Sequence, residues 1–204
     1  MLESICVTLD IGRMIELPKI IDYDEKRQEI IERAIDVFSE RGYYDTNFGH
    51  IAKECGMGRT TLYQYFDNKD ELFTHVMLKI LGDLERECRA VVDEPGISVI
   101  DKIKLIFSHL CRQCHIKRSK VGILLDLFVL LKLRKYDMDD SVNESFSRFK
   151  QLFVDLLQEG VRSREIKEIE TESMAMTLYN LLRASVLKVS AQKEDISQGY
   201  IQNL

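Results

Sequence analysis

Hydrophobic residues recur at helical spacing along most of the chain after Asp24. This period predicts amphipathic helices that each bury one face. The first helix is expected to end at Gly42, a residue suited to a helix C-terminus. Its apolar positions are Ile30, Ile31, Ala34, Ile35, Val37 and Phe38. Residues 1–23 differ, because apolar and polar residues alternate there with a strand-like period and no partner strand. We expect this segment to be an N-terminal extension of unassigned role.

Two short helices joined by a tight turn follow the first helix. Thr46 and Asn47 are good N-caps for the first of the two. A break with two glycines at residues 55–58 separates it from the second, at residues 59–66. Asn68 and Glu71 are then placed as a capping-box pair at the start of a long fourth helix. Two short helices around a glycine-containing turn are what a helix-turn-helix requires.

The second half of the chain also has helical spacing. Residues 121–133 are apolar on nearly every face, which predicts a helix buried on most sides. Strong apolar stripes predict two further long helices at about residues 141–160 and 171–191. The sequence therefore predicts an all-α protein with a three-helix, helix-turn-helix domain at residues 24–70. A larger helical domain is expected at residues 71–204.

Composition supports helices and bounds the class of protein. The 204 residues include only 10 glycines and 2 prolines, about half of the usual share of roughly 12%, which disfavours sandwiches and barrels rich in tight turns. The five cysteines are an odd number, and no secretory signal pattern is evident, so we expect reduced thiols and a cytoplasmic location. No apolar stretch reaches the roughly 18 residues of a membrane-spanning helix. The net charge of −5 at first argues against DNA binding.

The second short helix nevertheless carries side chains suited to DNA. Leu62 and Phe66, at positions i and i+4, are expected to hold this helix on the core and leave its polar residues outside. Arginine can bind guanine edges, threonine can contact bases or phosphates, and tyrosine hydroxyls commonly bind phosphate. Lys69, at the start of the fourth helix, is expected to hold a second phosphate. The predicted DNA-binding residues are Thr46, Asn47, Arg59, Thr60, Thr61, Tyr63, Gln64, Tyr65 and Lys69.

Several of these residues belong to a longer pattern. Its members are Gly42, Thr46, Ile51, Ala52, Gly56, Leu62, Tyr63, Tyr65, Phe66, Lys69 and Leu72, and residues 60–72 spell TTLYQYFDNKDEL. Together they resemble the N-terminal DNA-binding domain of the TetR family of bacterial transcriptional regulators, over about residues 24–73. The resemblance implies a one-component regulator, expected to be a repressor, that binds a palindromic double-stranded DNA operator as a homodimer.

The same resemblance implies a variable helical domain that binds a small-molecule effector and dimerises through its last two helices. Asp126 interrupts an apolar helix, so it is either partnered in the core or faces an effector cavity. The candidate effector-binding residues are Ser108, His109, Asp126 and Tyr136. The candidate dimer-interface residues, on the apolar stripes of the last two helices, are Phe146, Phe149, Phe153, Leu157, Leu178, Leu182 and Val186. We expect the effector to tilt the fourth helix and release DNA.

A second cluster of residues suggests a different chemistry. Residues 111–115 have the C-x-x-C-H spacing of haem attachment, and on a helix Cys111, Cys114 and His115 would share a face. The alternative interpretation is therefore a helical thiol, metal or haem sensor, and a helical module without DNA binding is a third. Haem attachment of this kind needs export, and a structural zinc site needs four ligands, so we expect no cofactor and no metal. No G-x-S-x-G, Walker-type or H-E-x-x-H sequence is present, so we do not expect an enzyme.

The net charge of −5 argues less strongly against DNA binding once the distribution of charge along the chain is considered. Residues 46–69 contain Lys53, Arg59 and Lys69 against Glu54 and Asp67, which gives +1 for this window and −6 for the rest of the chain. Much of the phosphate contact is then expected from hydroxyls, backbone amides and helix N-termini. We expect a modest dependence of DNA binding on salt.

Overall fold

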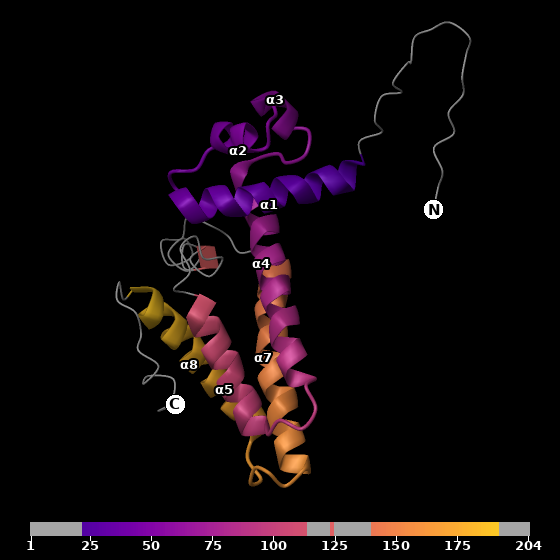
Figure 1. Ribbon diagram of the computed structural model, residues 1–204, viewed down its shortest axis with the longest axis vertical. Helices are drawn as coiled ribbons and strands as arrows, with labels where there is room; N and C mark the ends of the chain where they lie inside the picture. Colours follow the sequence, from indigo (N-terminus) through magenta and orange to yellow (C-terminus); the bar gives the residue numbers. More distant parts are fainter. Residues whose placement is uncertain (1–21, 114–122, 125–139, 192–204) are drawn as a thin grey trace, which may run out of the picture.

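The structure, a computed structural model, describes residues 22–113, 123–124 and 140–191. Within these ranges it contains seven α-helices and no strand, which confirms the all-α prediction (Figure 1). The helices are α1 (Tyr23–Arg41), α2 (Phe48–Glu54), α3 (Arg59–Leu62), α4 (Lys69–Val92), α5 (Val99–Gln113), α7 (Asp140–Arg162) and α8 (Thr171–Ala191).

Some predicted features lie outside the described residues. These are the alternating segment of residues 1–21, the candidate effector residues Asp126 and Tyr136, and the pair Cys114 and His115. Of the apolar run at 121–133 the structure describes Ile123 and Leu124, which are both buried. None of the described helices is long and apolar enough to span a membrane.

Helix α1 begins one residue earlier than the pattern of apolar residues indicates. The Asp22 carboxylate accepts hydrogen bonds from the backbone N–H groups of Asp24 and Glu25, at 2.9 and 3.3 Å. The expected N-terminal extension is therefore two residues too long, because Asp22 and Tyr23 belong to the helix and its cap. At the other end Gly42 has φ of 73°, a conformation that glycine adopts without strain.

The helices form a small head above a longer bundle. α1 lies across the first turns of α4, α2 packs on α1, and α3 packs on α2 (Figure 1). α4 then leaves the head and packs with α5 and α7, while α8 packs against α5 and α7. α4 is thus the helix that connects the head to the bundle.

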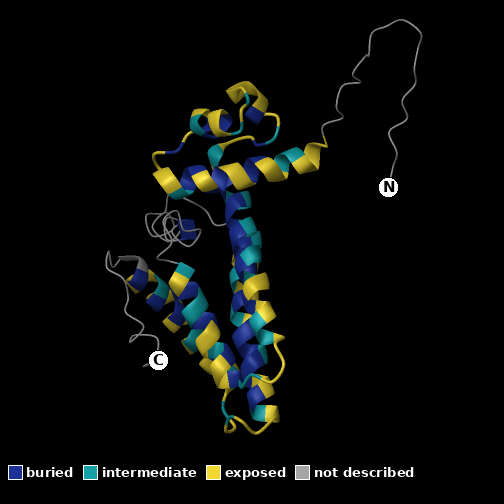
Figure 2. Cartoon of the chain, viewed as in Figure 1, coloured by how far each residue is buried: buried dark blue, intermediate teal, exposed yellow. Residues whose placement is uncertain are grey.

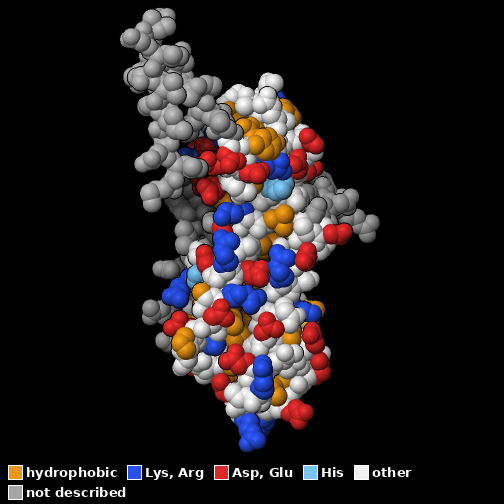
Figure 3. Space-filling view, turned by 90° about the vertical axis from the view of Figure 1, so that its right-hand side faces the viewer, with side chains coloured by type: hydrophobic (Ala, Val, Ile, Leu, Met, Phe, Trp, Pro, Cys, Tyr) orange, Lys and Arg blue, Asp and Glu red, His pale blue; other side chains and the backbone are white. Residues whose placement is uncertain are grey.

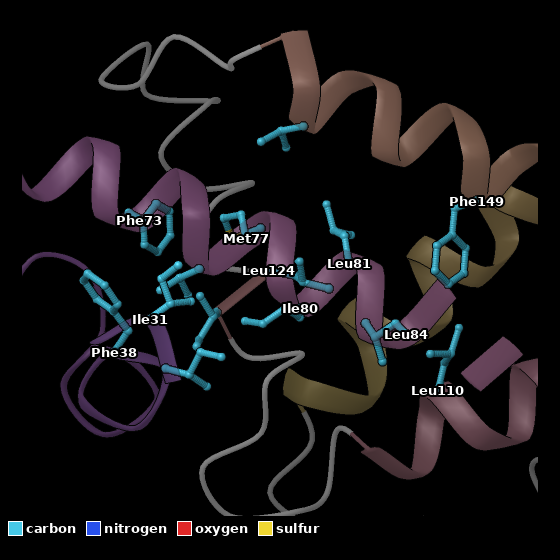
Figure 4. Packing of buried hydrophobic residues seen from close by; sticks show 14 of the residues in the cluster. Ile31, Phe38, Phe73, Met77, Ile80, Leu81, Leu84, Leu110, Leu124 and Phe149 are labelled. Carbon is cyan, nitrogen blue, oxygen red and sulfur yellow. The ribbon is translucent and has the colours of Figure 1, made fainter. Parts of the chain in front are cut away.

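One hydrophobic core extends from the head into the bundle (Figure 2). In the head, the rings of Phe38 on α1 and Phe73 on α4 meet edge to face with centroids 5.1 Å apart. In the bundle, Leu84 of α4 lies near Leu110 of α5 and Phe149 of α7 (Figure 4). α4 contributes side chains to both ends of this core. A displacement of α4 would therefore change the packing in the head and in the bundle.

The apolar stripes of α7 and α8 are used inside the protomer. Phe149, Phe153, Leu157 and Leu182 are buried. The other three predicted dimer residues are half-buried against the same core: Phe146, Leu178 and Val186. The four buried side chains are thus covered within the protomer, and a role of the seven residues in the dimer surface stays a prediction. Periodicity identifies the buried face of a helix but not its partner, and here the partners are helices of the same chain.

Candidate DNA-binding surface and effector cavity

Asn47 caps α2 through a reciprocal pair of hydrogen bonds. Its side-chain oxygen accepts from the backbone N–H of His50 at 3.1 Å, and the ring of His50 accepts from the backbone N–H of Asn47 at 3.4 Å. This capping box fixes the start of the helix. The sequence indicated Asn47, but it did not indicate His50, because histidine is an unusual third residue for such a box.

Helix α3 ends at Leu62, four residues before the predicted end, and is held by one apolar side chain of its own and one from the turn that follows. Leu62 and Phe66 are 0% and 1% exposed, as their i, i+4 spacing predicts. Gly58 caps the helix without a side-chain hydrogen bond. The polar residues around α3 are left on the surface (Figure 2): Asn47, Arg59, Thr60, Thr61, Tyr63 and Gln64. Six of the nine predicted DNA-binding residues thus share one exposed region.

Tyr63 and Arg59 support each other on this surface. The Tyr63 ring lies 4.8 Å from the ring of Phe48 on α2, measured between centroids. An Arg59 guanidinium N–H donates to the Tyr63 hydroxyl at 3.2 Å, and its Cζ lies 5.8 Å from the Tyr63 ring centroid. Both side chains remain exposed, so they reach outward from a fixed base, which lowers the entropy lost on binding.

Thr46 has a different position from the one predicted. Its side chain is 2% exposed, and its hydroxyl donates to the carbonyl of Gly42 at 2.7 Å. The hydroxyl is therefore turned into the α1–α2 connection and closes that turn. The expectation that the Thr46 side chain contacts DNA is corrected accordingly.

Lys69 bridges elements of the head instead of extending into solvent. Its Nζ donates to the carbonyls of Tyr43 and Thr46, at 2.8 and 3.0 Å, and lies 4.0 Å from the Tyr43 ring centroid. Partial burial lowers the pKa of the ammonium, and the neighbouring Asp70 and Asp45 oppose that shift. In this structure Lys69 links α4 to the α1–α2 turn, and the phosphate contact expected from the sequence stays a prediction.

Arg27 makes a second link, between α1 and the segment after α3. Its guanidinium donates to the Tyr65 carbonyl at 2.8 Å and to Glu71 Oε1 at 2.9 Å. It also lies over the Phe66 ring, 4.4 Å from the centroid. Tyr65, predicted to contact DNA, is half-buried and stacks on Tyr23 with centroids 4.9 Å apart. These contacts join residues more than 35 positions apart in sequence, so periodicity gives no sign of them.

The sequence prediction for the start of α4 is partly right. Asn68 accepts a hydrogen bond from the backbone N–H of Glu71 at 2.9 Å. The Glu71 carboxylate does not complete a reciprocal box, since its Oε2 accepts from the backbone N–H of Asp67 at 2.6 Å. It satisfies an amide in the turn after α3 and thereby ties that turn to α4.

Charge on the surface is mixed. On the face shown in Figure 3, Lys and Arg side chains alternate with Asp and Glu along the bundle, while hydrophobic side chains gather near the head. This agrees with the near-neutral charge of residues 46–69. Contacts to DNA from this surface would depend on hydroxyls and amides as well as cations.

The bundle contains a cavity of about 70 Å³ between α4, α5, α7 and α8. Its lining residues are Leu81, Leu84, Leu110, Leu124, Phe146, Phe149, Tyr179, Leu182, Arg183 and Val186. The predicted effector residues Ser108 and His109 are not in this lining. His109 faces Glu87 of α4 instead, with Nε2 2.7 Å from the carboxylate. Four lining residues lie on the apolar stripes of α7 and α8 that the sequence analysis assigned to dimerisation: Phe146, Phe149, Leu182 and Val186.

Cys111 is buried in α5, and burial raises the pKa of its thiol. Within the described residues, no group of three or more His, Cys, Asp or Glu side chains is arranged to hold a metal ion.

The helix-turn-helix head corresponds to a known domain. Residues 30–76 match the sequence model of the bacterial regulatory proteins of the tetR family. Over this domain the chain is similar to the TetR family. It has the helix-turn-helix of a DNA-binding transcriptional regulator.

The similarity to known regulators extends into the bundle. The fatty acid metabolism regulator protein of Bacillus subtilis is 26% identical over 145 residues, which are 70% of this chain and 72% of that protein. The solved structure of the fatty acid degradation regulator FadR from Bacillus halodurans matches with a TM-score of 0.70 at 22% identity, covering 87% and 91% of the two chains. The Bacillus subtilis regulator FadR, solved in complex with stearoyl-CoA, matches with a TM-score of 0.62 at 21% identity, covering 82% and 90%. At these identities the solved structures establish the fold.

Proposed function

We propose that the protein is a homodimeric repressor that binds a palindromic operator and is released by a small-molecule effector. One observation carries this proposal: the polar face of α3 is exposed while Leu62 and Phe66 anchor the helix from the other side. An exposed second helix on a fixed base is the arrangement that enters the major groove in helix-turn-helix proteins. Residues 22–70 would form the DNA-binding domain, and the rest of the chain the effector and dimerisation domain.

The DNA contacts are divided between base reading and positioning. Arg59 is suited to guanine edges, and Thr60, Thr61 and Gln64 to bases or phosphates. Tyr63 and Asn47 would donate to phosphate oxygens. Lys69, Thr46 and Tyr65 would support this surface from behind.

The dimer would form through the outer face of α8. Met176 and Leu181 are each 44% exposed, and Leu187 is 57% exposed. Ala184 lies between them on the same face. An exposed apolar face on a terminal helix supports pairing with the same helix of a second copy, which buries both faces about a two-fold axis. In such a dimer, the two α3 helices would face successive major grooves about 34 Å apart.

The effector would enter the cavity between α4, α5, α7 and α8. Leu81 and Leu84 bring α4 to this cavity. The first turn of the same helix is bonded to the head through Lys69 and through the hydrogen bond between Tyr43 and Asp70. A ligand that favours a shifted α4 would therefore also shift the head, by no more than its difference in affinity for the two states. Acyl compounds are the first candidates, since related regulators are named for fatty acid metabolism and one was solved with stearoyl-CoA.

Selection of bound fragments from the source genome tests this proposal. The purified full-length chain should enrich a small set of fragments that share a palindromic sequence, with salt-sensitive affinity. Addition of acyl-CoA or fatty acid should lower the affinity for these fragments. Enrichment of random fragments, or of none, would contradict the proposed function, whereas specific binding that no acyl compound changes would contradict only the choice of effector.

A further inference from the structure

The polar groups of the bundle cavity all belong to one helix. Eight of its ten lining residues carry purely apolar side chains, from α4, α5, α7, α8 and Leu124. The other two are Tyr179 and Arg183, which are one turn apart on α8. The Arg183 Cζ lies 5.6 Å from the Tyr179 ring centroid. The cavity therefore has an apolar body and a single polar edge.

Among the described residues, the charge at that edge comes from α8. Arg183 is the only formally charged residue that lines the described cavity. A guanidinium is planar, remains protonated and forms paired hydrogen bonds with carboxylates and phosphates. The guanidinium disfavours a cationic ligand, and a neutral oxygen would gain a hydrogen bond from it without the attraction between opposite charges.

We propose that Arg183 binds the anionic head of the effector while its hydrocarbon chain fills the apolar body of the cavity. This inference rests on the proposed function and specifies the ligand as an amphipathic anion. It is either a free carboxylate, whose charge adjoins the chain, or an acyl-CoA, whose phosphates would have to reach Arg183 past a neutral thioester and the pantetheine arm. Both heads match a guanidinium, so their common chemistry is what the structure selects.

Tyr179 is suited to assist at the same edge. Burial raises the pKa of its phenol, against a smaller opposing effect of Arg183. The phenol therefore remains neutral at physiological pH and keeps a hydroxyl proton to donate to a carboxylate or a thioester carbonyl. A neutral donor beside a cation favours an anion without a second charge to desolvate.

The size of the cavity indicates a suitable probe. A volume of 70 Å³ has room for roughly five water-sized groups, so a six-carbon chain fits with little rearrangement. Hexanoate and hexanoyl-CoA supply the two anionic heads. Hexanol and hexylammonium carry the same chain with a neutral and a positive head.

Calorimetric titration of the four probes into the full-length protein tests the inference. We expect at least one anionic probe to bind tenfold or more tightly than hexanol, and hexylammonium to bind most weakly. Arg183→Gln should remove the preference for anions, and Arg183→Lys should retain part of it. Arg162→Gln, which removes an exposed cation at the end of α7, is the matched control and should leave the preference unchanged. Binding of hexanoyl-CoA alone would identify the phosphate-bearing head, and binding of both would identify the carboxylate as sufficient.

Equal affinity of the wild-type protein for hexanoate, hexanoyl-CoA and hexanol would overturn the role of Arg183. So would an anion preference that survives Arg183→Gln, or no binding of any probe by protein that still binds its operator. Operator affinity is measured on the same samples, so a failure of DNA binding is recognised separately. If hexanol releases the operator as well as the anions do, the proposed effector control stands and the inferred anion site fails.

Discussion

Lys69 joins the first turn of α4 to carbonyls 23 and 26 positions earlier in the chain. Two of its three N–H donors are used in this way, and the ammonium also lies against the Tyr43 ring. The hydrogen bonds satisfy carbonyls that neither α1 nor α2 can satisfy, because both lie in the connection between those helices. We therefore assign Lys69 a structural role in the head.

Replacement of Lys69 by Met should destabilise the protein by about 1 to 3 kcal/mol, because the Thr46 carbonyl loses the Lys69 donor and the Tyr43 carbonyl is left with the backbone N–H of Thr46 at 3.4 Å. Thermal or urea unfolding measures the change. Lys53→Met, at an exposed position of α2, is the control and should change stability by less than about 0.5 kcal/mol. Unchanged stability of the Lys69 variant, together with weaker DNA binding and a smaller salt dependence, would instead support a phosphate clamp.

The reactivity of single cysteine residues tests the alternative interpretation of the protein as a thiol sensor. Burial raises the pKa of the Cys55 thiol to about 11 and that of Cys88 to about 12, and it also raises the pKa of Cys111. A raised pKa lowers the thiolate fraction, by about two orders of magnitude or more for Cys55 and Cys88 at pH 8. Iodoacetamide should thus modify these three thiols slowly in the native protein and rapidly after unfolding, as peptide mass spectrometry would show. Rapid native alkylation of Cys111 would favour a thiol sensor.

At the scale of the elements, two glycines inside long helices have opposite surroundings. A Cβ added at Gly82 in α4 would have no heavy atom within 4 Å. A Cβ added at Gly160 in α7 would lie 2.6 Å from Ile166 Cδ1 and 3.2 Å from Val99 Cγ1. Gly160 is therefore required for the close approach of α7 to the chain that follows it, whereas Gly82 is not required by packing.

Gly82→Ala should stabilise the protein by about 0.5 to 1 kcal/mol, because alanine loses less backbone entropy in a helix. Gly160→Ala should destabilise it by about 1 to 3 kcal/mol through overpacking. Urea unfolding of the two variants beside the wild type measures both. The same sign of change in both variants would show that the packing around α7 is not as described.

The helices themselves could be predicted from the sequence, and their partners could not. Caps such as Asn47 and Asn68 and the spacing of Leu62 and Phe66 are local signals, and the structure contains them. The bonds of Arg27 and Lys69 join distant parts of the chain, so no local pattern reports them. For the same reason, the stripe of Phe149 and Phe153 indicated a buried face, but not whether a second copy or the same chain covers it.

At the scale of the whole molecule, the outer face of α8 is the proposed contact between two copies. Leu181→Glu would place a charge in that contact and should convert the dimer to a monomer, because burial of an unpaired carboxylate is costly. Light scattering coupled to size exclusion measures the mass. Leu105→Glu, at a 40% exposed position of α5, is the matched control and should remain dimeric. A dimeric Leu181 variant and a monomeric Leu105 variant would move the interface to α5.

The proposed DNA-binding head has few cationic side chains available for contacts to phosphate. Residues 46–69 have a net charge of +1, and Lys69 is committed to the backbone carbonyls of Tyr43 and Thr46. Specific binding must then depend on the contacts made by α3 more than on general attraction to phosphate.

The central claim is that α3 recognises DNA bases, and the affinity of Arg59→Ala tests it most directly. Fluorescence anisotropy at fixed salt compares this variant with the wild type on the selected operator fragment and on a scrambled fragment. Arg162→Ala, at the last residue of α7, which ends far from the head (Figure 1), is the control. We expect Arg59→Ala to lose about tenfold or more in operator affinity and most of its preference for the operator, while the control behaves as the wild type. Unchanged affinity and preference in Arg59→Ala would contradict the claim.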